Sequence, residues 1–254
     1  MLRNSSLRSI KHLAVCACLV LTTLTFAACS SRQERAQNYY ESGVKYLGKH
    51  EYAKARVQLK NALQLKDDML PAWRALSKVE EHGKNLKAYA GTLRRIVELD
   101  GKDFKSRVRL AKLYLLGGAV DDALKTTNAA AKLDPTSADV HALKAAVLFK
   151  LKDTDGARRE AHKALEIEPG NVDASVVLAV DHFVSGDMQA ALKQLSAVRK
   201  SDSDNLGVIA LKLSIYTRLK EPDHVESLLK QLVKLHPNQS NFRLQLVKFY
   251  LAQK

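Results

Sequence analysis

The sequence predicts an all-α protein in which pairs of short helices stack into a solenoid. The main observation is a pattern that recurs every 34 residues between residues 36 and 239. A second observation is that helix-breaking residues recur at both turns of the pattern. Pro135, Pro169 and Pro237 share one repeat position, and proline cannot continue a helix. Because one pair of short helices cannot bury its own apolar face, each pair must pack on its neighbours.

The stretch from Val108 to Pro135 shows the pattern most clearly. Its first half has apolar residues at helical spacing and ends at Gly117-Gly118. Asp121-Asp122 opens the second half, where acidic side chains suit the free N–H groups and the positive end of the helix dipole. The residues found again 34 positions later are Ala123, Ala130, Leu133 and Pro135, which become Ala157, Ala164, Ile167 and Pro169.

This pattern resembles the tetratricopeptide repeat (TPR), a helix-turn-helix unit with a period of about 34 residues. The resemblance implies a right-handed solenoid of six units over residues 36–239, followed by a further first helix over 240–254. The units would span 36–69, 70–103, 104–137, 138–171, 172–205 and 206–239. Glu80 stands where the family usually has tyrosine, and Tyr89 and Val225 stand where it usually has alanine. We expect looser or shifted packing in those two units.

The composition fits a helical protein with a continuous core and a basic surface. Hydrophobic residues make up 46% of the chain, and the formal net charge is +14. One interpretation of the charge is that it only keeps exposed helix faces soluble. The other is attraction to acidic partners, such as an anionic glycan, lipid headgroups or acidic peptide segments. All three cysteines precede the repeats, so the repeats form no internal disulfide.

The first 28 residues have the features of a secretory signal peptide. Basic and polar residues come first, an apolar run from Leu13 to Phe26 follows, and Ala27-Ala28 stands directly before Cys29. The apolar run is shorter than the roughly 20 residues that a membrane span needs. Ala-Ala-Cys resembles the bacterial lipobox, in which the cysteine is acylated and becomes the new N-terminus. A plain signal peptide cleaved near Ala28 is the alternative.

The lipobox resemblance predicts a protein held at a membrane from its periplasmic side. Residues 1–28 would be removed, and residues 29–35 would form a short tether with a lipid on Cys29. Each buried acyl methylene contributes about 0.8 kcal/mol, so several chains give stable anchoring. In the bacterial sorting rule, aspartate after the cysteine favours the inner membrane. Ser30 and Ser31 therefore imply the outer membrane, and export disfavours nucleic acid as a partner.

In TPR arrays the first helices line the concave face, and the resemblance carries this role to the second to fifth units. The basic residues at these positions are Arg74, Lys78, Lys105 and Lys112, with Arg109 close by. The apolar residues are Ala142, Ala146, Phe149, Val176, Val180 and Phe183. They predict a groove that changes from basic to apolar and binds a protein segment with an acidic and an apolar part. Alternatively, Phe149 and Phe183 pack against neighbouring helices.

The sequence contains no pattern that indicates catalysis or a metal site. Its histidines form no His-x-x-x-His pair and no Cys/His cluster with metal spacing. It has no Gly-x-Ser-x-Gly elbow and no glycine-rich phosphate loop. We therefore predict a protein that is not an enzyme and uses neither a cofactor nor a metal.

These features predict a membrane-tethered, periplasmic scaffold for protein–protein interaction that serves the assembly or export of an envelope structure. The run from Arg56 to Leu63, behind a lipobox and a short tether, resembles the TPR lipoproteins associated with exosortase and exopolysaccharide systems. Size and layout also resemble the TPR lipoproteins that pilot secretin assembly for type IV pili. A third interpretation is a module that binds peptidoglycan or another polysaccharide through its basic face.

The stretch from Ser240 to Lys254 predicts a helix that is apolar on more than one face. Its apolar residues are Phe242, Leu244, Leu246, Val247, Phe249, Tyr250 and Leu251. One face can pack on the sixth unit, which leaves an apolar stripe of the kind that usually marks a contact. We expect this stripe to be covered by a continuation of the chain in a longer protein, by a partner or by a second copy.

Overall fold

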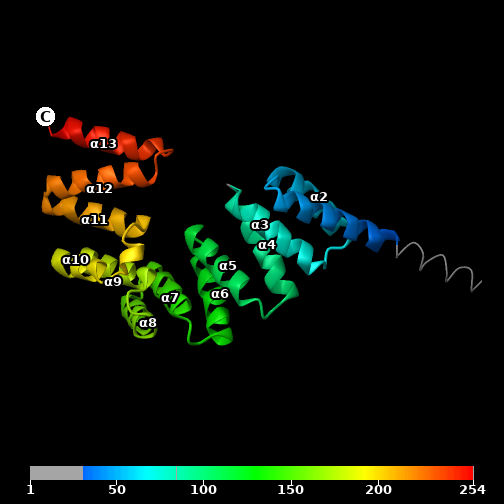
Figure 1. Cartoon of the computed structure of the whole chain (residues 1–254). Helices are drawn as coiled ribbons and strands as arrows, with labels where there is room; N and C mark the ends of the chain where they lie inside the picture. Colours follow the sequence, from blue (N-terminus) through cyan, green and yellow to red (C-terminus); the bar gives the residue numbers. More distant parts are fainter. Residues whose placement is uncertain (1–30, 84, 254) are drawn as a thin grey trace, which may run out of the picture. The chain divides into compact units, whose positions relative to one another are not determined.

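The structure is a computed structural model that describes residues 31–83 and 85–253. The described residues form helices joined by short turns, and no strand occurs among them (Figure 1). The all-α class predicted from the sequence is therefore confirmed for this part of the chain. The expected signal peptide over residues 1–28 and the expected lipidation residue Cys29 lie outside the described residues.

The chain divides into two compact units, with the boundary between Ser106 and Arg107. In the first, here called the N-terminal unit, residues 31–48 are helical. The helices that follow are α2 (Tyr52–Leu65), α3 (Leu70–Glu81), α4 (Leu86–Leu99) and the first turn of α5 (Phe104–Leu116).

The second unit, here called the C-terminal unit, contains the rest of α5 and the helices up to α13. Their bounds are α6 (Val120–Leu133), α7 (Ala138–Lys150), α8 (Thr154–Ile167), α9 (Val172–Ser185) and α10 (Met188–Ser196). After the 3-10 turn η1 (Lys200–Asp202) come α11 (Leu206–Leu219), α12 (Pro222–Leu235) and α13 (Ser240–Ala252).

Successive helices alternate between two series, each with a constant period. The first helices α3, α5, α7, α9, α11 and α13 begin at residues 70, 104, 138, 172, 206 and 240. The second helices α2, α4, α6, α8, α10 and α12 begin at residues 52, 86, 120, 154, 188 and 222. Both series therefore advance by 34 residues, because the breakers between helices recur with that spacing.

Short polar side chains fix several of the helix starts. At each of them an N-cap side chain accepts a hydrogen bond from a free N–H of the first turn. The capping residues are Asn85, Asp153, Asn171, Asp187 and Asn205. At the other end of α9, Gly186 has a φ of +90°, a left-handed conformation that favours glycine at a helix C-terminus.

Small residues lie where neighbouring helices approach most closely. In the N-terminal unit, Gly43 faces α2, and a Cβ atom on it would lie only 2.6 Å from Leu59 Cγ. In the C-terminal unit, α7, α8 and α9 share a cluster of buried alanines. Its members are Ala142, Ala145, Ala157, Ala161, Ala164 and Ala174. Close approach of this kind brings each helix pair into contact with the next helix pair, and the contacts form a continuous core within each unit.

One departure from the family pattern, Glu80, is explained by a local contact. Glu80 is only 3% exposed, and its carboxylate accepts hydrogen bonds from Arg56 Nε and Nη2 at 2.9 and 3.1 Å. This ion pair joins α2 to α3. Tyr89 and Val225, at the usual alanine positions, are both buried.

The fifth repeat, over residues 172–205, has a short second helix that the sequence does not predict. Helix α10 has 9 residues, whereas α8 and α12 have 14. The chain then turns through η1, and Arg199 contacts Glu168 Oε1 at 2.5 Å and Asp202 Oδ2 at 2.8 Å. These ion pairs hold the segment after α10 against the turn that precedes α9.

The last described helix, α13, packs through one face on the sixth repeat, which contains α11 and α12. Phe242 is buried in a cluster with Ile209 and Leu232. Leu244, Val247 and Leu251, which belong to the expected stripe, are more than half exposed. None of the described helices has the length and apolar character needed to cross a membrane.

Candidate functional site

Four helices of the C-terminal unit line a cavity of about 550 Å³, here called the first-helix groove. It is lined by residues of α5, α7 and α9 and of the start of α11. These residues are Lys112, Leu115, Leu116, Ala142, Leu143, Ala146, Lys150, Asp173, Val176, Val177, Asn205 and Gly207. The volume falls within the range of about 300 to 1,000 Å³ that is typical of ligand sites.

The groove has an apolar lining with room for side chains of a ligand. Leu115, Leu143 and Val177 supply aliphatic surface, and the small Ala142 and Ala146 stand one turn apart on α7. Leu116 also lines the groove and is 70% exposed. An apolar trough built from parallel helix faces suits a protein segment that inserts apolar side chains.

Charged residues stand beside this apolar surface. Lys112 Nζ on α5 lies 3.2 Å from Asp173 Oδ2 on α9, and both side chains are about half exposed. An exposed ion pair contributes only about 0 to 1 kcal/mol, so a ligand carboxylate can displace Asp173 from Lys112 at little cost. Lys150 on α7 supplies a second exposed ammonium group in the lining.

The structure brings some of the predicted groove residues into this cavity and directs others to the interior. Lys112 and Val176 line it. Phe149 is half-buried against the alanine cluster of α7, α8 and α9. Val180 and Phe183 pack against the buried residues of α9, α10 and α11, and Arg218 Cζ lies 5.6 Å from the centre of the Phe183 ring. The two phenylalanines thus have the packing positions that the sequence left open as an alternative.

The predicted basic residues are divided between the two units. Arg74, Lys78 and Lys105 belong to the N-terminal unit, whereas Arg109 and Lys112 belong to the C-terminal unit. All five side chains are exposed. Lys112 is the member of this basic set that lines the first-helix groove.

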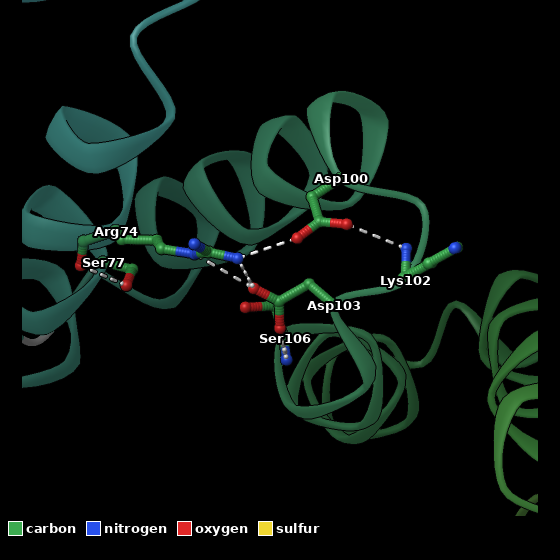
Figure 2. A network of polar contacts seen from close by, with 6 residues as sticks. All are labelled: Arg74, Ser77, Asp100, Lys102, Asp103 and Ser106. Carbon is green, nitrogen blue, oxygen red and sulfur yellow. Dashed lines mark hydrogen bonds and ion pairs between the residues drawn. The ribbon is translucent and has the colours of Figure 1, made fainter.

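Arg74 differs from the expectation of a cation available to a ligand (Figure 2). Its Nη2 atom donates to Asp100 Oδ2 at 2.8 Å and to Asp103 Oδ2 at 3.0 Å. The same carboxylates accept backbone N–H groups of Lys102 and Ser106, both close to 3.0 Å. Arg74 therefore links α3 to the turn between α4 and α5.

This network also changes the acidity of Asp103. Burial disfavours the charged carboxylate, but the N–H group of Ser106 and the Arg74 guanidinium donate hydrogen bonds to it. The hydrogen bonds outweigh burial, and the pKa of Asp103 lies below its ordinary value. The aspartate thus stays ionised and keeps Arg74 engaged.

Eight lining residues were not predicted as groove residues, namely Leu115, Leu116, Leu143, Lys150, Asp173, Val177, Asn205 and Gly207. Helical spacing connects several of them to predicted ones. Leu116 lies four residues after Lys112, Lys150 lies four after Ala146, and Asp173 lies three before Val176. Residues three or four apart share one helix face, so the same register contains them. Leu115 lies three residues after Lys112, and it both packs in the core and lines the groove.

Among the described residues, no group of three or more His, Cys, Asp and Glu side chains could hold a metal ion. The geometry of the first-helix groove is that of a binding surface for apolar groups. Its charged members, Lys112, Lys150 and Asp173, lie on three different helices, where they can orient a bound segment.

Several solved structures share this fold. A pilF protein of Pseudomonas aeruginosa is 18% identical, with a TM-score of 0.56 over 88% of this chain and 100% of that chain. PilW, a type IV pilus biogenesis factor, is 16% identical, with a TM-score of 0.59 over 83% and 98%. A MamA protein is 18% identical, with a TM-score of 0.57 over 67% and 93%. At such low identity the similarity shows a common fold and leaves function open.

The sequence itself matches a family model. No curated protein matches the chain. A family model described as tetratricopeptide repeat matches residues 81–147 and 148–214, which together make up more than half of the chain. The predicted repeat family is therefore confirmed, and its helices supply a scaffold for protein–protein interaction. The chain belongs to the tetratricopeptide repeat family.

Proposed function

We propose that this protein is a lipid-anchored scaffold of the bacterial envelope that holds a protein partner in the first-helix groove. The observation that supports this most directly is the apolar cavity of about 550 Å³ lined by α5, α7, α9 and the start of α11. A cavity of this size takes several apolar side chains of one partner segment.

The chemistry of the lining defines the segment that fits. Its apolar side chains would lie over Ala142 and Ala146, which leave space above α7. An acidic side chain next to them would bind Lys112 or Lys150. A helical or extended segment can meet both requirements. In a helical segment, the side chains at positions i, i+3, i+4 and i+7 lie on one face and can insert into the groove together.

The site of action follows from the leader. The lipobox-like sequence ending in Cys29 supports a lipid anchor, and Ser30 and Ser31 support the periplasmic face of the outer membrane. With residues 29–35 as a short tether, the repeats would work close to the membrane. The scaffold would there serve assembly or export of an envelope structure, such as the machinery for an exopolysaccharide.

Type IV pilus assembly is the second candidate function. It is favoured by the extent of the similarity to the pilus factor PilW, because this chain covers 98% of that protein. The two candidates share the scaffold and the groove and differ in the identity of the partner. Isolation of the partner from cross-linked envelope fractions decides between them.

Direct binding of an anionic glycan is a third candidate, supported by the net charge of +11 that 38 basic and 27 acidic residues give after removal of residues 1–28. It differs from groove binding in its dependence on salt. Charge-driven binding at exposed sites weakens steeply as the ionic strength rises, because the Debye length falls from about 10 Å at 0.1 M to about 3 Å at 1 M. Binding through apolar contacts in the groove persists across the same salt series.

The test of groove binding compares two matched substitutions in the C-terminal unit. Leu116 and Val184 are both 70% exposed, but only Leu116 lines the groove. We expect Leu116→Glu to reduce recovery of the cross-linked partner by about tenfold, equivalent to about 1.4 kcal/mol. Val184→Glu should leave recovery unchanged, and an equal loss in both variants would contradict the proposal.

A further inference from the structure

A second cavity, of about 470 Å³, lies in the N-terminal unit and is formed by α2, α3 and α4. We call it the α2–α4 groove. Its lining is Lys60, Leu63 and Gln64 from α2, Trp73, Leu76 and Glu80 from α3, and Ala88, Gly91 and Thr92 from α4. Within each helix, the first of these residues is followed by others three, four or seven positions later, so each helix presents one face to the cavity.

Gly91 leaves this groove open at a cost in helix stability. It lies in the interior of α4, where glycine is about 1 kcal/mol less favourable than alanine. A Cβ atom on Gly91 would meet no described atom within 4 Å, so no contact among the described residues requires glycine there. The missing side chain instead widens the groove next to Ala88 and Thr92.

The walls of the groove are held in place by polar contacts. The bidentate bond between Arg56 and Glu80 joins α2 to α3. Trp73 Nε1 donates to Asp67 O at 2.7 Å, and Arg95 Nη2 lies 3.3 Å from Asp67 Oδ2, which joins α4 to the turn after α2. A preformed groove loses little conformational entropy when a ligand binds.

Two of the three helices that form the walls, α2 and α4, are basic, whereas α3 carries two basic and two acidic residues. Helix α2 carries Lys54, Arg56 and Lys60 and no acidic residue, and α4 carries Lys87, Arg94 and Arg95 against the single acid Glu98. In the described part of the chain, Lys60 and Lys87 are exposed and have no ion-pair partner. Acidic side chains on a ligand would therefore find two available ammonium groups, that of Lys60 in the lining of the groove and that of Lys87, which lies four residues before Gly91 on α4.

We propose that the α2–α4 groove binds an amphipathic helix of a partner protein whose apolar face is flanked by acidic residues. Its apolar side chains would lie over Leu76 and the half-buried ring of Trp73 and enter the space left by Gly91. Its carboxylates would bind Lys60 and Lys87. This surface is formed by helices other than those of the first-helix groove, so it would be a second partner site.

The chain has one tryptophan, so its fluorescence reports directly on this groove. The probe is a synthetic helical peptide about five turns long, with leucines along one face and glutamates on both flanks. A control peptide has lysines in place of the glutamates. On titration into the purified full chain, the glutamate peptide should shift the Trp73 emission in a saturable manner, and the lysine peptide should bind at least about tenfold more weakly.

Substitutions at two glycines show where the peptide binds. Gly91→Leu fills the groove and should weaken binding of the glutamate peptide by about tenfold or more. Gly48→Leu is the matched control, because a Cβ atom on that exposed glycine also meets nothing within 4 Å. It should bind as the unsubstituted chain does. Circular dichroism and the thermal midpoint confirm that both variants fold.

Charge reversal tests the acidic flank. Lys60→Glu combined with Lys87→Glu should abolish the preference for the glutamate peptide and favour the lysine peptide. Leu116→Glu, in the other groove, should leave the Trp73 response unchanged, which separates this inference from the proposed function.

Three results would overturn the inference. The first is the absence of a Trp73 response to the glutamate peptide. The second is binding that Gly91→Leu leaves intact. The third is sedimentation showing that the unsubstituted chain forms a dimer that Gly91→Leu dissociates, because a second copy would then occupy the groove.

Discussion

Arg74 binds two carboxylates of its own unit because the turn between α4 and α5 returns next to α3 (Figure 2). The sequence shows an arginine on the exposed face of a helix and cannot show that Asp100 and Asp103 lie within 3.0 Å of it. Repeat register predicts the face of a helix on which a side chain lies. The hydrogen-bond partners of that side chain depend on the position in the fold of a turn some 26 residues further along the chain.

The first prediction compares Arg74 with its neighbour Lys78 on the same helix. Arg74→Glu places a third carboxylate next to Asp100 and Asp103, and we expect it to lower the free energy of unfolding by about 1 kcal/mol. Lys78→Glu, at an exposed position, should change it by less than about 0.5 kcal/mol. Urea unfolding of both variants checks this, and equal stabilities would show that the Arg74 network contributes nothing.

Glu160 is the centre of a second polar cluster, in the C-terminal unit. Its carboxylate lies 2.6 Å from His141 Nδ1, 3.2 Å from Lys144 Nζ and 3.4 Å from Lys163 Nζ. Burial opposes the charge on Glu160, but hydrogen bonds from His141 and Lys144 outweigh it and hold the pKa of Glu160 below its ordinary value. The ionised form therefore stabilises the packing of α7 on α8.

The second prediction follows from that lowered pKa. An acid whose pKa is lower in the folded state stabilises the fold above its unfolded pKa, about 4.3 for glutamate, and loses this effect as the pH falls through the folded value. Glu160→Gln should therefore be less stable than the unsubstituted protein at pH 7. The difference in unfolding free energy should shrink as the pH falls below about 4.3. A difference that stays constant across this range would contradict the account.

At the scale of the helix, the sequence predicts the order and starting points of the elements well. Breakers and small residues recur every 34 positions because each helix pair meets its neighbours at the same places. The early end of α10 could not be predicted in this way. It depends on Arg199, which contacts Glu168 on the preceding repeat, and on Gly170, where a Cβ atom would lie 3.0 Å from Arg199 Cγ. These are tertiary contacts without a local sequence signal.

The residues of the candidate site could likewise be predicted only in part from the repeat pattern. Lys112 and Val176 were predicted from register, and both line the first-helix groove. The repeat register predicts the same groove-facing side for Phe149 and Phe183, but these two side chains pack against buried clusters of neighbouring helices. How deep a side chain lies depends on the side chains opposite it, and the repeat period carries no information about those.

The third prediction compares two glycines at which an added methyl group should change the stability in opposite directions. A Cβ atom on Gly43 would lie 2.6 Å from the buried Leu59 Cγ, so Gly43→Ala should destabilise the fold by about 1 to 3 kcal/mol. A Cβ atom on Gly91 meets nothing, so Gly91→Ala should stabilise α4 by about 1 kcal/mol. Thermal unfolding measures both, and two changes of the same sign would show that the packing around one of them is misassigned.

At the scale of the whole molecule, the proposed function divides anchoring and binding between Cys29 and the repeats. The fourth prediction concerns the anchor. Mass spectrometry of the mature protein should find a diacylglyceryl group on an N-terminal Cys29, and Cys29→Ala should move the protein from the membrane fraction to the soluble fraction. An unmodified N-terminus at Cys29 or later would rule out the lipid anchor while leaving the repeats as an interaction scaffold.

The net charge also acts on the whole molecule. Residues 29–254 contain 38 basic and 27 acidic residues, a charge that would attract acidic partners over a distance and speed their encounter. Apolar lining in the two grooves would then hold them after contact. The account therefore expects association rates to fall with salt and dissociation rates to depend on groove substitutions such as Leu116→Glu.

The central claim is that the first helices of the C-terminal unit hold the partner, and contact mapping in intact cells tests it most directly. A photo-cross-linking amino acid is placed at Val176, which lines the first-helix groove, and separately at Arg159, which is exposed on the second helix α8. The account predicts a discrete adduct from position 176 and none from position 159. An adduct from 159 with none from 176 would contradict it.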